Sequence, residues 1–232
     1  MHELDRIRAE YARRALDPGL RERYSFFQPA NLFTVQTRER AVLHTLSQAG
    51  FRPLDRLEIL EVGCGAGGVL LDLIRWGADP ARVYGCDLVT DRVAKAYHRL
   101  PASTTLVVAD GGALPHPSAH FHLVRQFTVL TSVLDPELRQ RIAAEMWRVL
   151  RPGGAIVSYD FRLQGRNPAV RAIHPREIRA LFPGGTLLAR RVTLAPPITR
   201  RLAGWSWPGC ELLDRLPWLR THDLILIRKT EV

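Results

Sequence analysis

The sequence is poor in lysine and in cysteine. Lys95 and Lys229 are the only lysines, although the chain carries 33 basic against 23 acidic residues and a formal charge of +10. The positive charge is therefore nearly all arginine, which fits the codon usage of a GC-rich genome. The arginines are scattered in pairs instead of forming a stripe with interleaved aromatic residues, and this argues against a nucleic-acid partner.

The cysteines and the apolar residues exclude several further classes of protein. Cys64, Cys86 and Cys210 show neither paired spacing nor a histidine at ligand spacing, so we expect no disulfide framework and no metal site. No apolar run approaches the roughly 20 residues of a membrane-spanning helix. The charged N-terminus lacks the apolar core of a secretory signal. The sequence therefore predicts a cytoplasmic protein with no membrane partner.

The remaining pattern is one of alternating strands and helices. With 232 residues, of which 46% are apolar, the chain has the size of one α/β domain with a modest cap. Apolar runs predict strands at 57–62, 82–87, 105–110, 121–127, 155–161, 187–194 and 222–228. Helices are expected at 68–76, 91–100, 136–150 and 175–181. This order predicts a doubly wound α/β sheet.

The first 50 residues follow a different pattern. Residues 4–16 and 38–46 are expected to be helical, and the segment 24–29 between them is aromatic and irregular. We therefore predict an N-terminal helical cap over residues 1–50 and a ligand-binding domain over residues 51–232. Within the cap, residues 24–36 are expected to form a lid that orders when a cofactor binds.

An acid and a cluster of glycines lie where the first predicted strand turns into a helix, in the run Glu61-Val62-Gly63-Cys64-Gly65-Ala66-Gly67-Gly68. Without Cβ atoms, glycines permit positive φ and a close approach of a ligand to the main chain at the start of a helix. Four glycines in six positions favour a ligand site. Gly63, Gly65 and Gly68 also satisfy the dinucleotide fingerprint, so the glycines alone leave a nicotinamide oxidoreductase open.

The acid two residues before the first glycine resembles motif I of the class I S-adenosylmethionine-dependent methyltransferases. In that family the glycine turn packs against the methionine portion of the cofactor. The acid Asp87 at the end of the second strand resembles the residue that accepts from both ribose hydroxyls, although nicotinamide enzymes use an acid here too. Asp110 resembles the acid that binds the adenine amino group, and the backbone N–H of Gly111 would meet the ring.

The run Met146–Gly154 is similar to the turn that precedes the fifth strand in small-molecule (type 11-like) methyltransferases of this family. The resemblance extends over about residues 57–161. It implies a seven-stranded, mostly parallel sheet with an antiparallel last strand, a Rossmann-like methyltransferase fold, and S-adenosylmethionine as cofactor. The cofactor contacts that we expect are Glu61, Gly63, Cys64, Gly65, Gly67, Asp87, Leu88, Asp110, Gly111 and Gln126, with Gln36 and Tyr24 from the cap.

The acceptor site is expected in the loops after the fifth strand. His174 and Asp160 are the candidates for catalysis, and Tyr159 and Arg162 for contact with the acceptor, although His174 is equally suited to capping a helix and Asp160 to pairing with Arg162. Together with the cap, the arginines Arg162, Arg166 and Arg171 favour a sugar-like or acidic small molecule, such as a glycan or natural-product intermediate, methylated on oxygen or nitrogen.

Three other functions stay open. Gln126-Phe127-Thr128-Val129 after the fourth strand lacks the Asn/Asp-Pro-Pro-aromatic motif of base-methylating enzymes, which makes nucleic acid a weaker prediction than a small molecule. The alternatives are an RNA methyltransferase, an NAD(P)-dependent oxidoreductase, and a cofactor-binding subunit without activity of its own. The sequence gives no oligomeric state.

Overall fold

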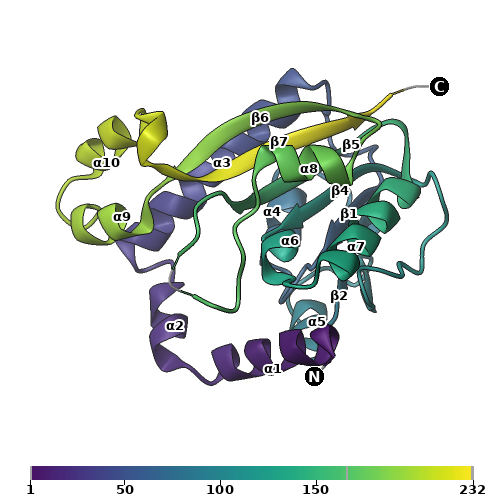
Figure 1. The fold of residues 1–232 in the computed structure, drawn as a ribbon, viewed down its shortest axis with the longest axis horizontal. Coiled ribbons are helices and arrows are strands. Elements are labelled where there is room, and N and C mark those ends of the chain that lie inside the picture. The colour runs from purple at the N-terminus through teal and green to yellow at the C-terminus, as the bar shows by residue number, and fades with distance from the viewer. Residues whose placement is uncertain (1, 166, 231–232) are drawn as a thin grey trace.

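A computed structural model describes residues 2–165 and 167–230, and its centre is a seven-stranded sheet (Figure 1). The strand order is β3-β2-β1-β4-β5-β7-β6. The strands are β1 (Ile59–Val62), β2 (Val83–Asp87), β3 (Thr105–Val108), β4 (Phe121–Phe127), β5 (Leu150–Phe161), β6 (Gly185–Leu194) and β7 (Arg220–Lys229). Strands β1 to β5 pair in parallel, while β7 runs antiparallel to both β5 and β6. The doubly wound fold expected from the sequence is confirmed.

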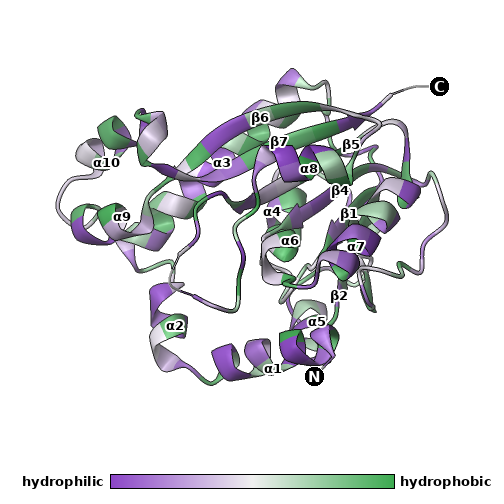
Figure 2. Ribbon diagram, viewed as in Figure 1, coloured by the Kyte–Doolittle hydropathy of each residue, from purple (hydrophilic) through white to green (hydrophobic). Residues whose placement is uncertain are grey.

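Helices cover both faces of this sheet. The described helices are α1 (Glu3–Ala15), α2 (Pro18–Arg23), α3 (Pro29–Gln48), α4 (Gly68–Arg75), α5 (Thr90–Tyr97), α6 (Val129–Ser132), α7 (Pro136–Val149), α8 (Pro175–Leu181), α9 (Pro196–Leu202) and α10 (Trp207–Asp214). One apolar core joins α3, α4 and α5 to the sheet, and a second core joins α7 and α8 to the opposite face. Figure 2 shows the corresponding pattern, with apolar strands inside and polar residues on the outer sides of the helices.

The structure differs from the expected elements at two places. Helix α3 begins at Pro29, so residues 32–36 are helical; proline is favoured at this first helical position because it has no N–H to leave unpaired. Strand β5 begins at Leu150, five residues earlier than expected, because Leu150 already pairs with Phe121 before a register shift.

The segment between β6 and β7 forms a small third core of its own. It folds into α9, α10 and the short 3₁₀ helix η2 (Pro217–Leu219), and it packs against the first half of α3. The rings of Phe33 and Trp207 meet edge to face with centroids 5.1 Å apart. Figure 1 shows α9 and α10 projecting beyond the sheet at one end of the molecule.

The strand order places the ligand-binding edge of the sheet. The chain leaves β1 toward β2 on one side, while β4 lies on the other, so the carboxyl ends of β1 and β4 flank a topological switch point. Ligands of open α/β sheets bind in the crevice at such a point. None of the described helices is both long enough and apolar enough to cross a bilayer.

Candidate active site

The glycine turn after β1 is held tightly against its neighbours. The backbone N–H groups of Gly63 and Cys64 both donate to the carbonyl of Cys86, at 2.8 and 2.9 Å. Gly63 has a φ of +73°, and a Cβ there would collide with the side chain of Val129. Only glycine fits this backbone conformation without strain. The turn therefore lies directly beside the segment that follows β4, at the switch point.

Asp87, at the end of β2, fixes the same turn from its other side. Its Oδ2 accepts from the N–H of Gly65 at 2.8 Å, and its Oδ1 accepts from the N–H of Val89 at 2.9 Å. The residue is 7% exposed. A carboxylate has about four acceptor positions, so two remain for hydroxyl groups of a ligand. The predicted ribose acceptor thus also shapes the loop that would hold the cofactor.

Asp110 and Gly111 follow β3, the strand next to β2. Strand pairing puts Asp87 opposite Val108, so the two acids leave the sheet at the same edge. Oδ1 of Asp110 accepts from the N–H of Gly112 at 2.8 Å, which leaves its second oxygen without a backbone donor. A Cβ on Gly111 would lie 3.2 Å from Val62 Cγ1, so this segment packs closely on β1.

Glu61 is paired with an arginine that the sequence analysis missed. Arg125 lies beside it on β4, and Arg125 Nε is 3.0 Å from Glu61 Oε2, with both side chains at 1% exposure or less. Burial raises the pKa of Glu61, and the Arg125 charge opposes that rise. None of the guanidinium nitrogens of Arg125 has a hydrogen-bond acceptor among the described residues. The available signal was a single charged residue, Arg125, inside the mostly buried fourth strand.

Arg38 on α3 is a second cation that the sequence did not indicate. Its guanidinium lies 5.3 Å from the ring centroid of Phe127 and 5.6 Å from that of Tyr159. Among the described residues it has no carboxylate partner within 4 Å. Gln36, expected to reach the cofactor, is instead exposed, because two residues of helix turn it about 200° away from Arg38. Arg38 precedes the buried Val42 by four positions, which is the spacing that places it toward the sheet.

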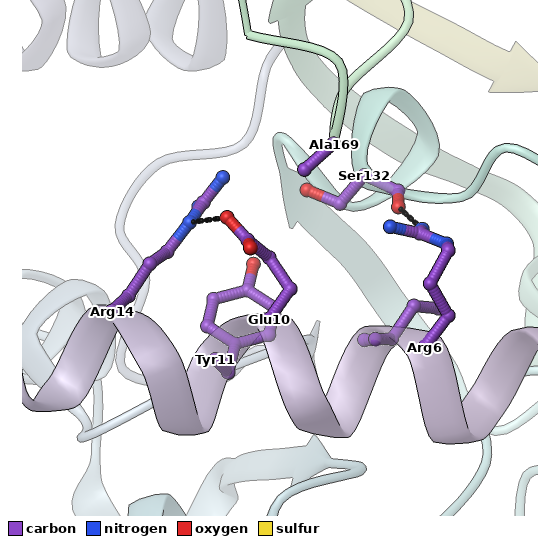
Figure 3. Close-up of a pocket in the computed structure, with 7 residues that line it drawn as sticks. Arg6, Glu10, Tyr11, Arg14, Ser132 and Ala169 are labelled. Carbon is purple, nitrogen blue, oxygen red and sulfur yellow. Dashed lines mark hydrogen bonds and ion pairs between the residues drawn. The ribbon is translucent and has the colours of Figure 1, made fainter.

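Helix α1 lies across the segment that follows β4. Arg6 donates to the carbonyl of Ser132 at 2.7 Å, as Figure 3 shows, and Glu3 accepts from the N–H of Leu134 at 2.7 Å. The guanidinium of Arg92 lies 4.3 Å from the ring centroid of Tyr11, and a Cβ on Gly65 would collide with Arg92. Tyr11 and Arg92 thus connect α1 to the glycine turn. Neither residue carried a signal in the sequence.

The pocket drawn in Figure 3, between α1, Ser132 and Ala169, has a volume of about 10 Å³. That is the space of a single water molecule. The other four labelled residues, Arg6, Glu10, Tyr11 and Arg14, belong to α1, which has no fully buried residue along its length. Helix α1 is therefore held at the site by polar contacts and by the partly buried Leu4 and Ile7.

Gln126 and Asp160 lie in one buried hydrogen-bond network. The Gln126 amide donates to Ser158 Oγ at 2.7 Å and to the Asp160 carboxylate, while its oxygen accepts from the N–H of Val129 at 2.9 Å. Asp160 also accepts from the N–H and the hydroxyl of Thr131. Both ends of Gln126 are used internally, and Asp160 is 2% exposed. These two side chains thus hold residues 128–131 against β5 through hydrogen bonds.

The other expected acceptor residues lie on both faces of the sheet. Tyr159 belongs to the core under α3, and its hydroxyl is hydrogen-bonded to Thr193 Oγ1 at 2.7 Å. Arg162 pairs at 3.8 Å with Asp223, not with Asp160. Burial raises the pKa of Asp223, and the charges of Arg162, Arg191 and His174 oppose that rise. The side chain of His174 makes no cap hydrogen bond to α8.

Tyr24, Arg171 and Arg166 were also expected at the site. Tyr24, at the end of α2, is exposed, and its carbonyl accepts from the amide of Asn31. Arg171 is exposed and pairs with Glu177 at 3.3 Å. Arg166 lies outside the described residues. Of the arginines expected near an acidic acceptor, the two that are described, Arg162 and Arg171, pair with different acids.

The antiparallel β7 and the glycine turn at the end of β1 define the class I methyltransferase fold. Residues 59–154 match the family model described as "Methyltransferase domain". A solved SAM-dependent methyltransferase from Archaeoglobus fulgidus superposes with a TM-score of 0.60 at 15% identity, over 85% of this chain and 98% of the other. Residues 59–154 thus form a methyltransferase domain, and the chain has the fold of the class I S-adenosylmethionine-dependent methyltransferases.

Two curated relatives differ in their acceptors. The tRNA N(3)-cytidine methyltransferase METTL2 of Gallus gallus is 32% identical over 111 residues, which are 44% of this chain and 30% of the relative. The ubiquinone biosynthesis O-methyltransferase of Rhizobium etli is 27% identical over 167 residues, 71% of this chain and 64% of the relative. The chain thus spans about a third of the tRNA enzyme and nearly two thirds of the ubiquinone enzyme.

S-adenosylmethionine, the cofactor of this family, fits the residues at the carboxyl edge. Gly63 and Gly65 of the turn have no room for a side chain, because a Cβ there would collide with Val129 or Arg92. The acids Asp87 and Asp110 keep free acceptor positions beside the turn. The family model that matches residues 59–154 favours a methyltransferase over the nicotinamide alternative.

We predict that Asp87→Ala weakens the binding of S-adenosylhomocysteine by about 30- to 100-fold, because a charged acceptor worth about 2 to 3 kcal/mol is lost. Loss of the bond from Gly65 N–H adds to the effect by loosening the turn. The measurement is isothermal titration calorimetry, with Asp91→Ala on the exposed side of α5 as the matched control. An unchanged dissociation constant for Asp87→Ala would remove this carboxylate from the site.

Proposed function

We propose that the protein transfers the methyl group of S-adenosylmethionine to a small-molecule acceptor. The observation that carries this proposal is the junction of the glycine turn with Asp87, where one carboxylate both shapes the loop and keeps acceptor positions for a diol. The ubiquinone-enzyme relative, which matches 71% of this chain, supports a small acceptor. A sugar-like or acidic molecule remains our preferred class, methylated on oxygen or nitrogen.

The protein would act mainly by alignment. When bound, the cofactor supplies a methyl group already activated by the positive sulfonium. The chain's own residues then have to orient two molecules and exclude water, and proximity alone supplies about 7 to 11 kcal/mol. Arg38, which has no described carboxylate partner and lies on the Phe127 and Tyr159 rings, is placed to hold a carboxylate of the cofactor or the acceptor.

For the acceptor, we propose contacts with Arg162 and His174 around Asp223 at the carboxyl end of β5. His174 is exposed there and is the candidate base for an acceptor that must lose a proton. Asp160 we propose as a positioning residue, because it accepts four hydrogen bonds from Ser158, Gln126 and Thr131 inside the fold.

A methylated tRNA is the second candidate product. The METTL2 match and the formal charge of +10 favour it, since a basic surface attracts phosphates. That match is confined to 44% of the chain and 30% of the relative, whereas the ubiquinone-enzyme match extends over 71% of the chain, so the small-molecule acceptor is preferred.

The experiment supplies S-adenosylmethionine labelled in its methyl group to the purified protein, with phenolic, carboxylate and sugar acceptors in one series and total tRNA in another. We expect label in a small-molecule product and none in the tRNA. Label in tRNA alone would mean that the protein is a tRNA methyltransferase, the second candidate. Label in neither, with tight cofactor binding, would favour a cofactor-binding subunit without activity of its own.

The lid that we propose is α1, in place of residues 24–36. The second half of that range belongs to α3, where Phe33 is fully buried against Trp207, so it is packed whether or not a cofactor is bound. Helix α1 has no fully buried residue and reaches the glycine turn through Tyr11 and Arg92. The cap then comprises a fixed α3 and a movable α1.

We expect S-adenosylhomocysteine to raise the hydrogen-exchange protection of α1 by at least about tenfold, because closure ties the helix to the occupied site. The amides of α3 between Phe33 and Leu46 should change little and serve as the internal control. Equal protection of α1 in both states would mean a permanently seated helix. Added protection confined to residues 24–28 would mean that this turn, and not α1, is the lid.

A further inference from the structure

One end of the molecule exposes large aromatic side chains that no described part of the chain covers. Phe27 is 96% exposed and Trp205 is 92% exposed. The exposed large apolar residues of this end, which we call the aromatic end, are Tyr24, Phe26, Phe27, Trp205, Leu212 and Trp218. Contiguous exposed apolar surface in a folded protein marks an interaction site more often than isolated residues do.

These residues come from two distant stretches of sequence that pack together. The turn at residues 24–28 leads into the first half of α3, and Ala30 and Phe33 in that half contact the core of the β6–β7 insert. Trp205 follows α9, Leu212 lies on α10, and Trp218 lies in η2. Figure 1 shows this insert at the end of the molecule, beyond the edge of the sheet.

The charges of the aromatic end are strongly one-sided. The exposed arginines there are Arg21, Arg23, Arg200, Arg201 and Arg215, and none of them has an ion-pair partner among the described residues. Of the acids there, Glu211 pairs with Arg40 and Asp214 pairs with Arg220. Asp17 and Glu22 accept hydrogen bonds from neutral donors only. Five unpaired arginines against two unpaired acids leave the net charge of this surface positive.

The positive charge continues into a groove of about 600 Å³ beside Trp218. Pro217 lines the groove together with Arg40, Arg190, Arg191 and Arg220. Thr193, whose hydroxyl meets that of Tyr159, lines it too. The groove thus runs from the aromatic end toward the tyrosine that the sequence assigns to the acceptor.

We propose that the aromatic end docks the protein onto an anionic lipid surface. Tryptophan and tyrosine prefer the boundary between lipid tails and headgroups, and nearby arginines are attracted to anionic headgroups. A second copy of this chain fits less well, because an isologous contact would bring five unpaired arginines against five others. This attachment is peripheral, so it agrees with the lack of a described helix that could span a bilayer.

An RNA strand is the other polyanion that could use arginines and aromatic rings, by stacking its bases. The rings of the aromatic end favour lipid, because they lie on a projecting end of the molecule, whereas stacked bases need a groove that also tracks the backbone. No phenylalanine, tyrosine or tryptophan lines the groove. The proposal does not depend on the methyl transfer reaction, and its test requires no turnover.

The test is sedimentation of the full chain with vesicles of phosphatidylcholine alone and of phosphatidylcholine with phosphatidylglycerol in equal parts. We expect binding to the mixed vesicles, little binding to phosphatidylcholine, and a blue shift of tryptophan emission on binding. The double variant Arg200→Gln/Arg201→Gln should lower the partition coefficient by roughly 20- to 30-fold. Phe27→Ser/Trp205→Ser should lower it by at least about tenfold.

The matched controls are Arg52→Gln/Arg56→Gln, which removes two exposed arginines before β1, and Leu71→Ser, which removes an exposed leucine of α4. Both controls should bind as the unchanged protein does. Absence of binding to the mixed vesicles would overturn the proposal, as would equal losses in the controls. Binding of a single-stranded RNA that the Phe27 and Trp205 variant abolishes, without vesicle binding, would assign the surface to RNA. A dimer in solution that the same variant dissociates would assign it to a second copy.

Discussion

The close approach of three backbone segments at the carboxyl edge of β1 constrains the rest of this structure. The glycine turn donates backbone hydrogen bonds to the carbonyl of Cys86 on β2 and to the Asp87 carboxylate. It also packs against Val129 after β4. No side chain fits into the turn at Gly63, so its position is set by the main chain alone. A ligand at this point meets N–H groups and carboxylates whose places are fixed before it arrives, which reduces the cost of ordering them on binding.

Two buried polar groups support that arrangement from opposite faces of the sheet. On the α3 face, Arg125 pairs with Glu61 under the turn. On the other, Gln126 and Asp160 hold the segment after β4 through its backbone N–H groups. Removing one partner from such a buried group leaves the other unsatisfied, which costs several kcal/mol. These residues act on the site by fixing its backbone, and they need not touch the cofactor to matter.

The sequence predicted what local chemistry and topology determine. The glycine turn, Asp87 and Asp110 follow strand ends directly, and parallel strands bring their carboxyl ends to one edge, so these residues could be placed from spacing alone. Arg38, Arg92 and Tyr11 could not, because their roles depend on how α1, α3 and α5 pack across the sheet. Gln36 was predicted to reach the cofactor because residues 32–36 were not recognised as part of a helix. Because no apolar run is long enough to span a bilayer, the sequence predicted no membrane partner. The exposed aromatic end instead leads us to propose peripheral binding to a lipid surface, which a hydropathy pattern does not reveal.

The central claim is that the edge formed by the glycine turn, Asp87 and Asp110 holds S-adenosylmethionine beneath α1. The most direct measurement is a crystal structure of the full chain with S-adenosylhomocysteine. We expect the ribose to lie on Asp87, the adenine to lie beside Asp110 and Gly111, and the sulfur to lie next to the glycine turn, with α1 closed over the ligand. Ligand density in the arginine-lined groove between α3 and β6, with the glycine turn unchanged and solvent-filled, would contradict it.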